Sequence, residues 1–221
     1  MVSGPGAGVG VYLVVEEMKV LVACEFSGIV REAFNQRGHR ATSADLLPTE
    51  IPGDHYQGDV LDILDQGWDL MIAHPPCTYL CNSGVRWLYN QDGTENKDRW
   101  DKMLDATDFF YHLLNSGHLH HIPKIAVENP IPHGEMYRNG LIGPYTQIIH
   151  PWQYGHSEKK STCLWLHNLP KLIPNKFIDN RKNPVRKESI WKEPPGPNRQ
   201  KNRSRTFPGI AAAMADQWGA A

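Results

Sequence analysis

Long apolar runs, paired cysteines and an excess of charge of one sign are all missing from this 221-residue sequence. No run of 18 apolar residues is present, so the sequence predicts no membrane-spanning helix. The four cysteines form no CxxC pair, so neither a disulfide scaffold nor a zinc ribbon is expected. Lys and Arg number 23 against 24 Asp and Glu, so no basic field covers the whole chain. The length and the 40 % hydrophobic content predict one globular core. The cysteine pattern favours a cytoplasmic protein whose thiols are reduced.

The overall charge balance conceals a basic stretch. Residues 171–205 hold 11 Lys and Arg against 3 Asp and Glu, a local excess of +8 that leaves −9 for the remainder. Such asymmetry indicates either an edge that faces a polyanion or a solvated, loop-rich segment. Residues 1–17 are glycine-rich and have no basic beginning, so we expect an N-terminal extension there rather than a signal peptide, with Met18 as the functional start.

Short apolar runs alternate with helical periodicity along the chain. Strands are expected at 19–24, 40–44, before Asp59, and at 69–73, 124–127, 145–150 and 162–166; helices are expected between 29 and 38, at 101–115 and at 210–218. This alternation predicts an α/β fold with a mostly parallel sheet and helices on both faces. Ligands bind such sheets at the carboxyl ends of the strands. That rule singles out residues 25–28, Asp45, Asp59, 74–77 and 128–130.

The first three strand ends suit a nucleoside-bearing cofactor. The turn at residues 25–28 precedes a helix, whose first backbone N–H groups are expected to face a ligand. Asp45 follows the next strand, where an acid can accept hydrogen bonds from ribose hydroxyls. Asp59 follows the third strand, where a carboxylate can accept from an exocyclic amine. Taken singly, each of these residues is as readily a cap or turn residue.

Two further strand ends carry reactive side chains. Pro75 and Pro76 hold Cys77 in a stiff turn, where a nearby cation or helix N-terminus would favour its nucleophilic thiolate. The alternative for a free cysteine is structural burial, which we assign to Cys81 and Cys163. Partial desolvation of Glu128 predicts a raised pKa and an acid that works near neutral pH, the alternative being a cap or an ion-pair partner.

A metal site is not expected. His118, His120 and His121 stand close together in the sequence, but no cysteine or carboxylate lies at ligand spacing from them. A polar turn is the expected structure there.

These residues resemble the DNA cytosine 5-methyltransferases, in the small form found in phages and prophages. Residues 75–77 are similar to the nucleophile motif of that family, and residues 128–130 to its glutamate motif, which usually reads Glu-Asn-Val. Residues 154–160 resemble its later motif that begins Tyr-Gly, and residues 209–218 lie where its last helix closes the cofactor pocket. The similarity covers residues 19–219 and implies a Rossmann-like S-adenosylmethionine-dependent methyltransferase fold.

The resemblance implies a division of the chain and a mechanism. Residues 18–166 and 203–221 would form the catalytic domain, and 167–202 a short basic, loop-rich region that contacts DNA. Cys77 would add to carbon 6 of cytosine, Glu128 would protonate ring nitrogen 3, and carbon 5 would take the methyl group. The target base would be flipped out of the duplex, and no metal would be needed.

The resemblance also assigns binding residues. Those expected at the cofactor, S-adenosylmethionine, are Glu25, Phe26, Ser27, Gly28, Asp45, Leu46, Asp59, Val60 and Pro75. Those expected at the substrate are Pro76, Asn129, Ser83 and Arg86, the last two from a stretch, 82–101, that looks like a mobile loop closing over the flipped base.

Two departures from the family pattern affect the prediction. Glu158, Lys160 and Thr162 stand where the family has Gln and two Arg, so Lys160 is the expected holder of the carbonyl oxygen of the base. Residues 167–202 are too few for the usual target-recognition domain. We predict phosphate contacts, hence short or weak sequence specificity and strong salt dependence, from Arg181, Lys182, Arg186, Lys187, Arg199, Lys201, Arg203 and Arg205.

Methyl transfer to carbon 5 of cytosine in DNA is the leading prediction. An alternative keeps the chemistry but acts on a free deoxycytidine nucleotide, which the missing domain favours and the basic stretch opposes. An amino methyltransferase fits less well, because that class uses an aromatic residue where Cys77 follows the two prolines. A catalytically silent DNA-binding homologue is a third alternative, against which the presence of Cys77 and Glu128 argues.

Overall fold

A seven-stranded sheet forms the centre of the computed structural model, which describes residues 16–138, 140, 142–178, 193–196 and 198–220. Its order is β3-β2-β1-β4-β5-β7-β6. The strands are β1 (Lys19–Ala23), β2 (Arg40–Asp45), β3 (His55–Gln57), β4 (Leu70–Ala73), β5 (Lys124–Pro130), β6 (Gln147–Ile149) and β7 (Thr162–His167). The pairs among β1 to β5 are parallel, whereas β7 runs antiparallel to both β5 and β6. The expected mostly parallel sheet is confirmed.

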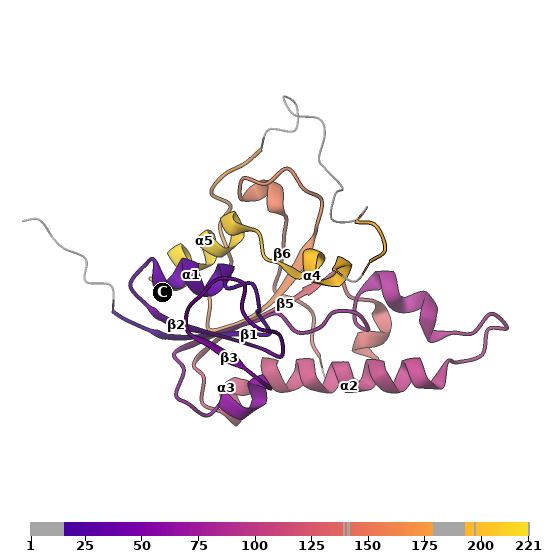
Figure 1. The fold of residues 1–221 in the computed structure, drawn as a ribbon. Helices are drawn as coiled ribbons and strands as arrows, with labels where there is room; N and C mark the ends of the chain where they lie inside the picture. Colours follow the sequence, from indigo (N-terminus) through magenta and orange to yellow (C-terminus); the bar gives the residue numbers. More distant parts are fainter. Residues whose placement is uncertain (1–15, 139, 141, 179–192, 197, 221) are drawn as a thin grey trace, which may run out of the picture.

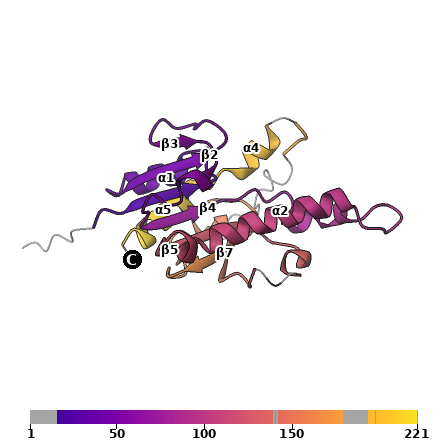
Figure 2. The same ribbon diagram turned by 90° about the horizontal axis from the view of Figure 1, so that it is seen from below.

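Helices cover both faces of this sheet, as expected (Figures 1 and 2). One face carries α1 (Ile29–Asn35) and α5 (Pro208–Trp218), and the other carries α2 (Lys97–Leu114) and α3 (Ser116–Leu119). The shorter helices are η1 (Val60–Ile63), η2 (Asn82–Leu88), η3 (Gly134–Tyr137), η4 (Pro151–Gln153) and α4 (Arg199–Ser204). None of the helices in the described ranges has the length and apolar character needed to span a membrane.

The core has two parts, one on each face of the sheet. Val22, Phe34 and Trp218 belong to the part beneath α1 and α5, and Met71 and Phe110 to the part beneath α2. The central strands β1 and β4 contribute side chains to both parts, so they are apolar along nearly their whole length. This double burial is why those two strands are recognisable in the sequence.

Two element boundaries and one expected loop differ from the sequence expectation. Helix α2 begins at Lys97 rather than at residue 101, because the Asn96 side chain accepts from the Arg99 N–H at 3.2 Å and caps the helix. Strand β5 continues to Pro130, because residues 128–130 pair with the beginning of β7. Residues 82–101, expected to form an open loop, consist instead of η2, a turn closed by a Tyr89–Glu95 bridge, and the first turn of α2. Closure of this stretch over a base stays a prediction.

Helix α5 is tied to distant parts of the chain. The backbone N–H of Gly209 donates to His156 Nε2 at 2.9 Å, and a Cβ at Gly209 would lie 2.0 Å from the Tyr154 carbonyl oxygen. At its other end, Trp218 Nε1 donates to the Pro170 carbonyl at 2.9 Å. The Tyr-Gly motif therefore touches the beginning of the last helix, and only glycine fits that close approach.

Candidate active site

The candidate site lies at the carboxyl edge of the parallel strands, where β1, β4 and β5 end side by side. Ala23 pairs with Ala73, and Ala73 pairs with Val127. The backbone N–H of His74 donates to the Ala23 carbonyl at 2.9 Å and extends this register by one residue. The residues after β4 and those near the end of β5 are thereby adjacent.

His74 and Glu128 form a hydrogen-bonded pair at this edge. His74 Nδ1 lies 2.9 Å from Glu128 Oε2. Burial acts to raise the pKa of Glu128, but the His74 hydrogen bond and the positive charge of Lys160 outweigh it, so the pKa lies below its usual range. The raised pKa expected from the sequence is therefore wrong, because the residues that lower it come from β4 and from the segment before β7.

Cys77 stands next to a second thiol, that of Cys81. The N–H groups of Leu80 and Cys81 both donate to the Cys77 carbonyl at 3.1 Å, and this turn brings the two side chains together. The hydrogen bond to Cys81, followed by burial, raises the pKa of Cys77 well above its ordinary value, while Lys160 opposes the rise. The same hydrogen bond lowers the pKa of Cys81 to about 5. The negative charge of the pair therefore rests on Cys81.

The structural burial expected for Cys81 is wrong. Cys81 is half-buried, and its Sγ lies 3.0 Å from Ser83 Oγ. Its spacing of four residues from Cys77 is the signal that sequence reasoning overlooked. Cys163, by contrast, is buried as expected.

Lys160 lies within electrostatic reach of both Glu128 and Cys77, because its charge lowers the pKa of each. Its Nζ donates to the Arg203 carbonyl at 3.0 Å, which holds the ammonium group in place. The three residues predicted to be catalytic are thus brought together, although they come from three separate segments of the chain.

The residues predicted to bind the substrate differ in exposure. Pro76 and Ser83 are exposed beside the thiol pair, and Arg86 is exposed with its guanidinium over the Trp87 ring. Asn129 is fully buried, and its Nδ2 donates to the Pro130 carbonyl at 2.6 Å. Its Oδ1 is buried without a hydrogen-bond partner among the described residues, and its expected contact with the substrate stays a prediction.

The turn after β1 supplies its own hydrogen-bond acceptor to the free N–H groups at the beginning of α1. Glu25 accepts from the Ser27 hydroxyl at 2.8 Å and from the Val30 N–H at 2.9 Å. The N–H groups expected to face a ligand are thus occupied by a carboxylate of the same turn. Gly28 adopts φ of 74°, and a Cβ there would lie 2.8 Å from the Arg31 guanidinium. Phe26 is buried in the same turn.

The ends of β2 and β3 combine acids with apolar surface. Asp45 accepts from the Leu47 N–H at 2.9 Å, and burial raises its pKa. Leu46 beside it is 73 % exposed. Asp59 caps η1 by accepting from the Leu61 N–H at 3.0 Å. Pro75, in the turn after β4, and Val60, the first residue of η1, are buried.

A buried arginine, Arg31, holds the loop between β2 and β3. It donates to Ser43 Oγ at 2.9 Å and to the Ile51 carbonyl at 2.5 Å. Its position on α1 gave no sequence signal beyond one charge on an otherwise apolar face. The loop that carries Leu46 is therefore fixed from the helix behind it.

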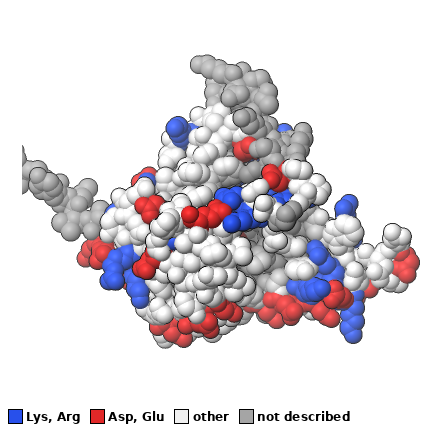
Figure 3. All heavy atoms as spheres, in the orientation of Figure 1, with Lys and Arg blue, Asp and Glu red and all other residues white. Residues whose placement is uncertain are grey.

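The basic segment folds back over the first turn. Arg205 donates from two nitrogens to Glu50 at 2.7 Å each, and Lys201 reaches the same carboxylate at 3.0 Å. Both cations lie over the Phe26 ring, at 5.2 Å for Lys201 and 5.9 Å for Arg205. The Arg205 hydrogen bond, helped by Lys201, lowers the pKa of Glu50 to about 2. Figure 3 accordingly shows basic side chains beside acidic ones rather than a continuous basic face.

The other predicted phosphate contacts are only partly located. Arg199 and Arg203 are half-buried on α4. Those that lie outside the described residues are Arg181, Lys182, Arg186 and Lys187.

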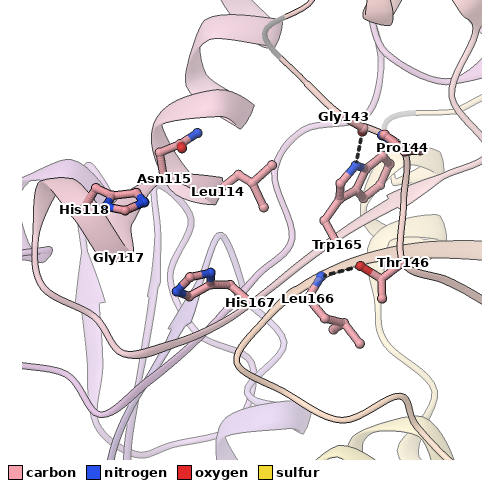
Figure 4. A pocket seen from close by; sticks show the side chains of 10 residues that line it. All are labelled: Leu114, Asn115, Gly117, His118, Gly143, Pro144, Thr146, Trp165, Leu166 and His167. Atoms are coloured by element: carbon pink, nitrogen blue, oxygen red, sulfur yellow. Dashed lines mark hydrogen bonds between the residues drawn. The ribbon is translucent and has the colours of Figure 1, made fainter.

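A separate pocket of about 260 Å³ lies away from this site (Figure 4). Among its lining residues, Trp165 and His167 belong to β7, and His167 pairs with Ile125 at the amino end of β5. It is therefore at the edge of the sheet opposite to Cys77. No group of residues suited to a metal ion is found within the described ranges.

Comparison with solved structures gives the fold. The chain matches a candidate DNA modification methyltransferase encoded within a prophage of E. coli, with a TM-score of 0.50 and 14 % identity over 73 % of this chain and 52 % of that one. The chain has a methyltransferase fold. The Dnmt2 methyltransferase of S. pombe also matches, with a TM-score of 0.39 and 15 % identity over 75 % of this chain and 53 % of that one.

The chain thus spans about half the length of these two proteins. No protein-family model and no curated protein matches the sequence. At this level of identity the likeness concerns the fold alone.

Proposed function

We propose that the protein transfers a methyl group from S-adenosylmethionine to carbon 5 of cytosine in DNA. The observation that carries the proposal is the convergence of Cys77, Glu128 and Lys160 at one sheet edge. A nucleophile, an acid and a cation are the three groups that this chemistry requires of a protein. The methyltransferase fold supports the same conclusion.

The neighbouring strand ends fit S-adenosylmethionine. Its adenosine carries no phosphate, and the first turn offers no free helix amides for one, because Glu25 occupies them. Its amino group is cationic, which suits the Glu25 carboxylate, and its ribose hydroxyls suit the Asp45 carboxylate as hydrogen-bond acceptor. The exposed Leu46 offers an apolar surface to the adenine, with Asp59 within the same strand-end region. When bound, this group supplies a methyl carbon open to nucleophilic attack.

The side chains then have distinct tasks. The Cys77 proton passes to the Cys81 thiolate, which accepts its hydrogen bond, and the Cys77 sulfur forms a bond to carbon 6 of the base. Glu128 protonates ring nitrogen 3, so the ring accepts the electron pair, and Lys160 holds the carbonyl oxygen. Carbon 5 becomes nucleophilic by this addition. After transfer, the carbon 5 proton passes to water, its electron pair forms the carbon 5–carbon 6 double bond, and the bond from carbon 6 to sulfur breaks. Ring nitrogen 3 returns its proton to Glu128, and the released Cys77 sulfur regains its proton from Cys81.

DNA is the proposed substrate, with the target base flipped out because carbon 6 is inaccessible within the base stack. A second candidate is the same reaction on a free deoxycytidine nucleotide. Glu50 favours that candidate, since it neutralises Lys201 and Arg205, two of the cations expected to contact phosphates.

Methyl transfer from labelled S-adenosylmethionine tests the proposal. Duplex DNA, single-stranded DNA and free deoxycytidine nucleotides are offered separately, and the methylated nucleoside is identified by mass. The expected product is 5-methylcytosine in DNA. Product on the free nucleotide alone supports the second candidate, and label on an amino group refutes both.

Two variants test the mechanism. Cys77→Ser should abolish transfer, whereas Asp98→Asn, which changes an exposed ion pair with Lys102 on α2, should retain it. DNA that contains 5-fluorocytosine should form a covalent adduct with the wild type and the control but not with Cys77→Ser, because fluorine at carbon 5 cannot leave as a proton does. Transfer that persists unchanged in Cys77→Ser contradicts the mechanism.

A further inference from the structure

The His74–Glu128 pair is rigidly built into the sheet edge. His74 Nδ1 lies 2.9 Å from Glu128 Oε2, and only 8 % and 14 % of these side chains are exposed. The His74 backbone is held by its bond to Ala23, and Pro75 and Pro76 follow it directly. The imidazole therefore stands on a stretch of backbone with little freedom.

The hydrogen bond decides which oxygen of Glu128 can carry a proton. Oε2 already accepts the Nδ1–H of His74, so a protonated Glu128 holds its own hydrogen on Oε1. An acid that protonates a ring nitrogen has to present an O–H group rather than a bare oxygen. Only one of the two protonated forms of Glu128 therefore suits both partners.

We propose that His74 is a positioning residue, whose Nδ1–H holds Oε2 of Glu128 so that Oε1 offers the proton to ring nitrogen 3 of cytosine. This role rests on the proposed function for its substrate. In the step, the O–H bond at Oε1 breaks and an N–H bond forms at nitrogen 3. The electron pair of the O–H bond stays on Glu128 as a carboxylate, which the His74 N–H stabilises without losing its own proton. The reverse transfer restores the acid.

The second ring nitrogen of His74 agrees with this role. Nε2 is buried and has no hydrogen-bond partner among the described residues. An unpaired buried nitrogen is destabilising, and the only hydrogen bond that this imidazole makes among the described residues is the one to Glu128. With no acceptor beside Nε2 in the described part of the chain and a carboxylate oxygen beside Nδ1, the hydrogen on Nδ1 is the one that finds a partner.

Other charged groups also face Glu128. Lys160 approaches from the segment before β7 and lowers the pKa of Glu128, and Cys77 with Cys81 lies on the turn after β4. Cys163 on β7, which pairs with Asn129, also lies within electrostatic reach of Glu128. None of these four residues is changed in variants of His74. A change between such variants therefore reports on the His74 hydrogen bond.

Two substitutions separate positioning from a merely structural role. His74→Ala removes the donor, whereas the amide N–H of His74→Asn stands close to where Nδ1–H was. In His74→Ala, kcat should fall about 10- to 100-fold, the loss expected for a hydrogen bond to a charged group. The alkaline limb of its pH–kcat profile should move to higher pH, because the bond that lowers the pKa of Glu128 is gone. His74→Asn should restore both properties.

Titration of the Glu128 carboxyl by carbon-13 NMR, without DNA or S-adenosylmethionine, provides a readout that needs no activity. Its signal is identified by its loss in Glu128→Gln. The pKa should rise in His74→Ala and not in His74→Asn, with both variants shown to be folded by their melting temperatures. An unchanged titration in His74→Ala, or a lower kcat with an unmoved limb, overturns the role of His74. Failure of the wild type to transfer methyl groups overturns the proposed function instead, and the titration still reports on the pair.

Discussion

Glu50 and Arg205, which are 155 residues apart in the sequence, form an ion pair through two hydrogen bonds of 2.7 Å each. Lys201 joins the same carboxylate at 3.0 Å. The pair connects the loop after β2 to the segment before α5, directly over Phe26. One acidic side chain thus decides whether two basic ones are available to a polyanion.

Glu50→Gln should tighten DNA binding. The substitution removes one negative charge and releases Lys201 and Arg205 to contact phosphates, so the slope of log affinity against log salt should steepen by about 1 to 2. Binding isotherms at several salt concentrations measure this slope. Asp98→Asn is the matched control, because it removes the same charge from a remote pair with Lys102. An equal effect of both variants would show that net charge alone is responsible.

Glu50 should also make stability depend on pH in the acid range. Its pKa is lowered from 4.5 to about 2 in the folded protein, chiefly by Arg205, so its contribution is fully present above about pH 5. The contribution is lost as the pH falls from 4.5 toward 2. For so exposed a pair we expect about 0.5–1 kcal/mol. Melting temperatures of wild type and Glu50→Gln should therefore differ at pH 7, with a difference that shrinks below pH 4.5 and vanishes near pH 2. A difference independent of pH would contradict this.

Cys81 should react with iodoacetamide before Cys77. With a pKa of about 5 against an ordinary value of 9.0, Cys81 is almost wholly thiolate at pH 6.5. A thiolate of lower pKa is also intrinsically less nucleophilic, which reduces the net advantage over an ordinary thiol to about fivefold. Peptide mass spectrometry measures the rate at each cysteine. In Cys77→Ala the Cys81 rate should rise with pH beyond 7, whereas in the wild type it should be level there; a level profile in both would rule out the coupling.

Gly209→Ala should destabilise the protein. The added Cβ would lie 2.0 Å from the Tyr154 carbonyl oxygen, so α5 or the Tyr-Gly motif has to shift. A cost of about 1–3 kcal/mol is typical of such overpacking, which corresponds to a melting temperature about 3–10 °C lower in a chain of this size. Thermal denaturation measures it. The control is Gly134→Ala, where no atom lies within 4 Å of the added carbon, and a comparable loss there would refute the steric explanation.

The sequence predicts those features that depend on local pattern. Strands β1 and β4 are apolar because both of their faces are buried, and the turns with Glu25 and Cys77 follow directly after them. Glu128 is different, because its place inside β5 depends on antiparallel pairing with Leu164, which is remote in the sequence. The lowered pKa of Glu128 could not be predicted either, because His74 and Lys160, which lower it, are also remote in the sequence.

Two further site features depend on side-chain geometry rather than on residue type. Glu25 was expected within a ligand-binding turn, yet its carboxylate bends back to the Val30 N–H, and no spacing rule indicates that direction. Glu50 was not singled out, because a lone glutamate in a loop gives no sign of an arginine 155 residues later. Contacts between distant segments, rather than the elements themselves, are what the sequence does not reveal.

The position of α5 has a consequence for synthesis on the ribosome. Val22 of β1 is among the first core residues to be translated, but Met214 and Trp218, which cover the same face of the sheet, come nearly two hundred residues later. Until those residues leave the exit tunnel, this face of the nascent sheet stays open to water and to chaperones. A ribosome that stalls before Pro208 therefore holds a chain with an exposed apolar surface on this face of the sheet.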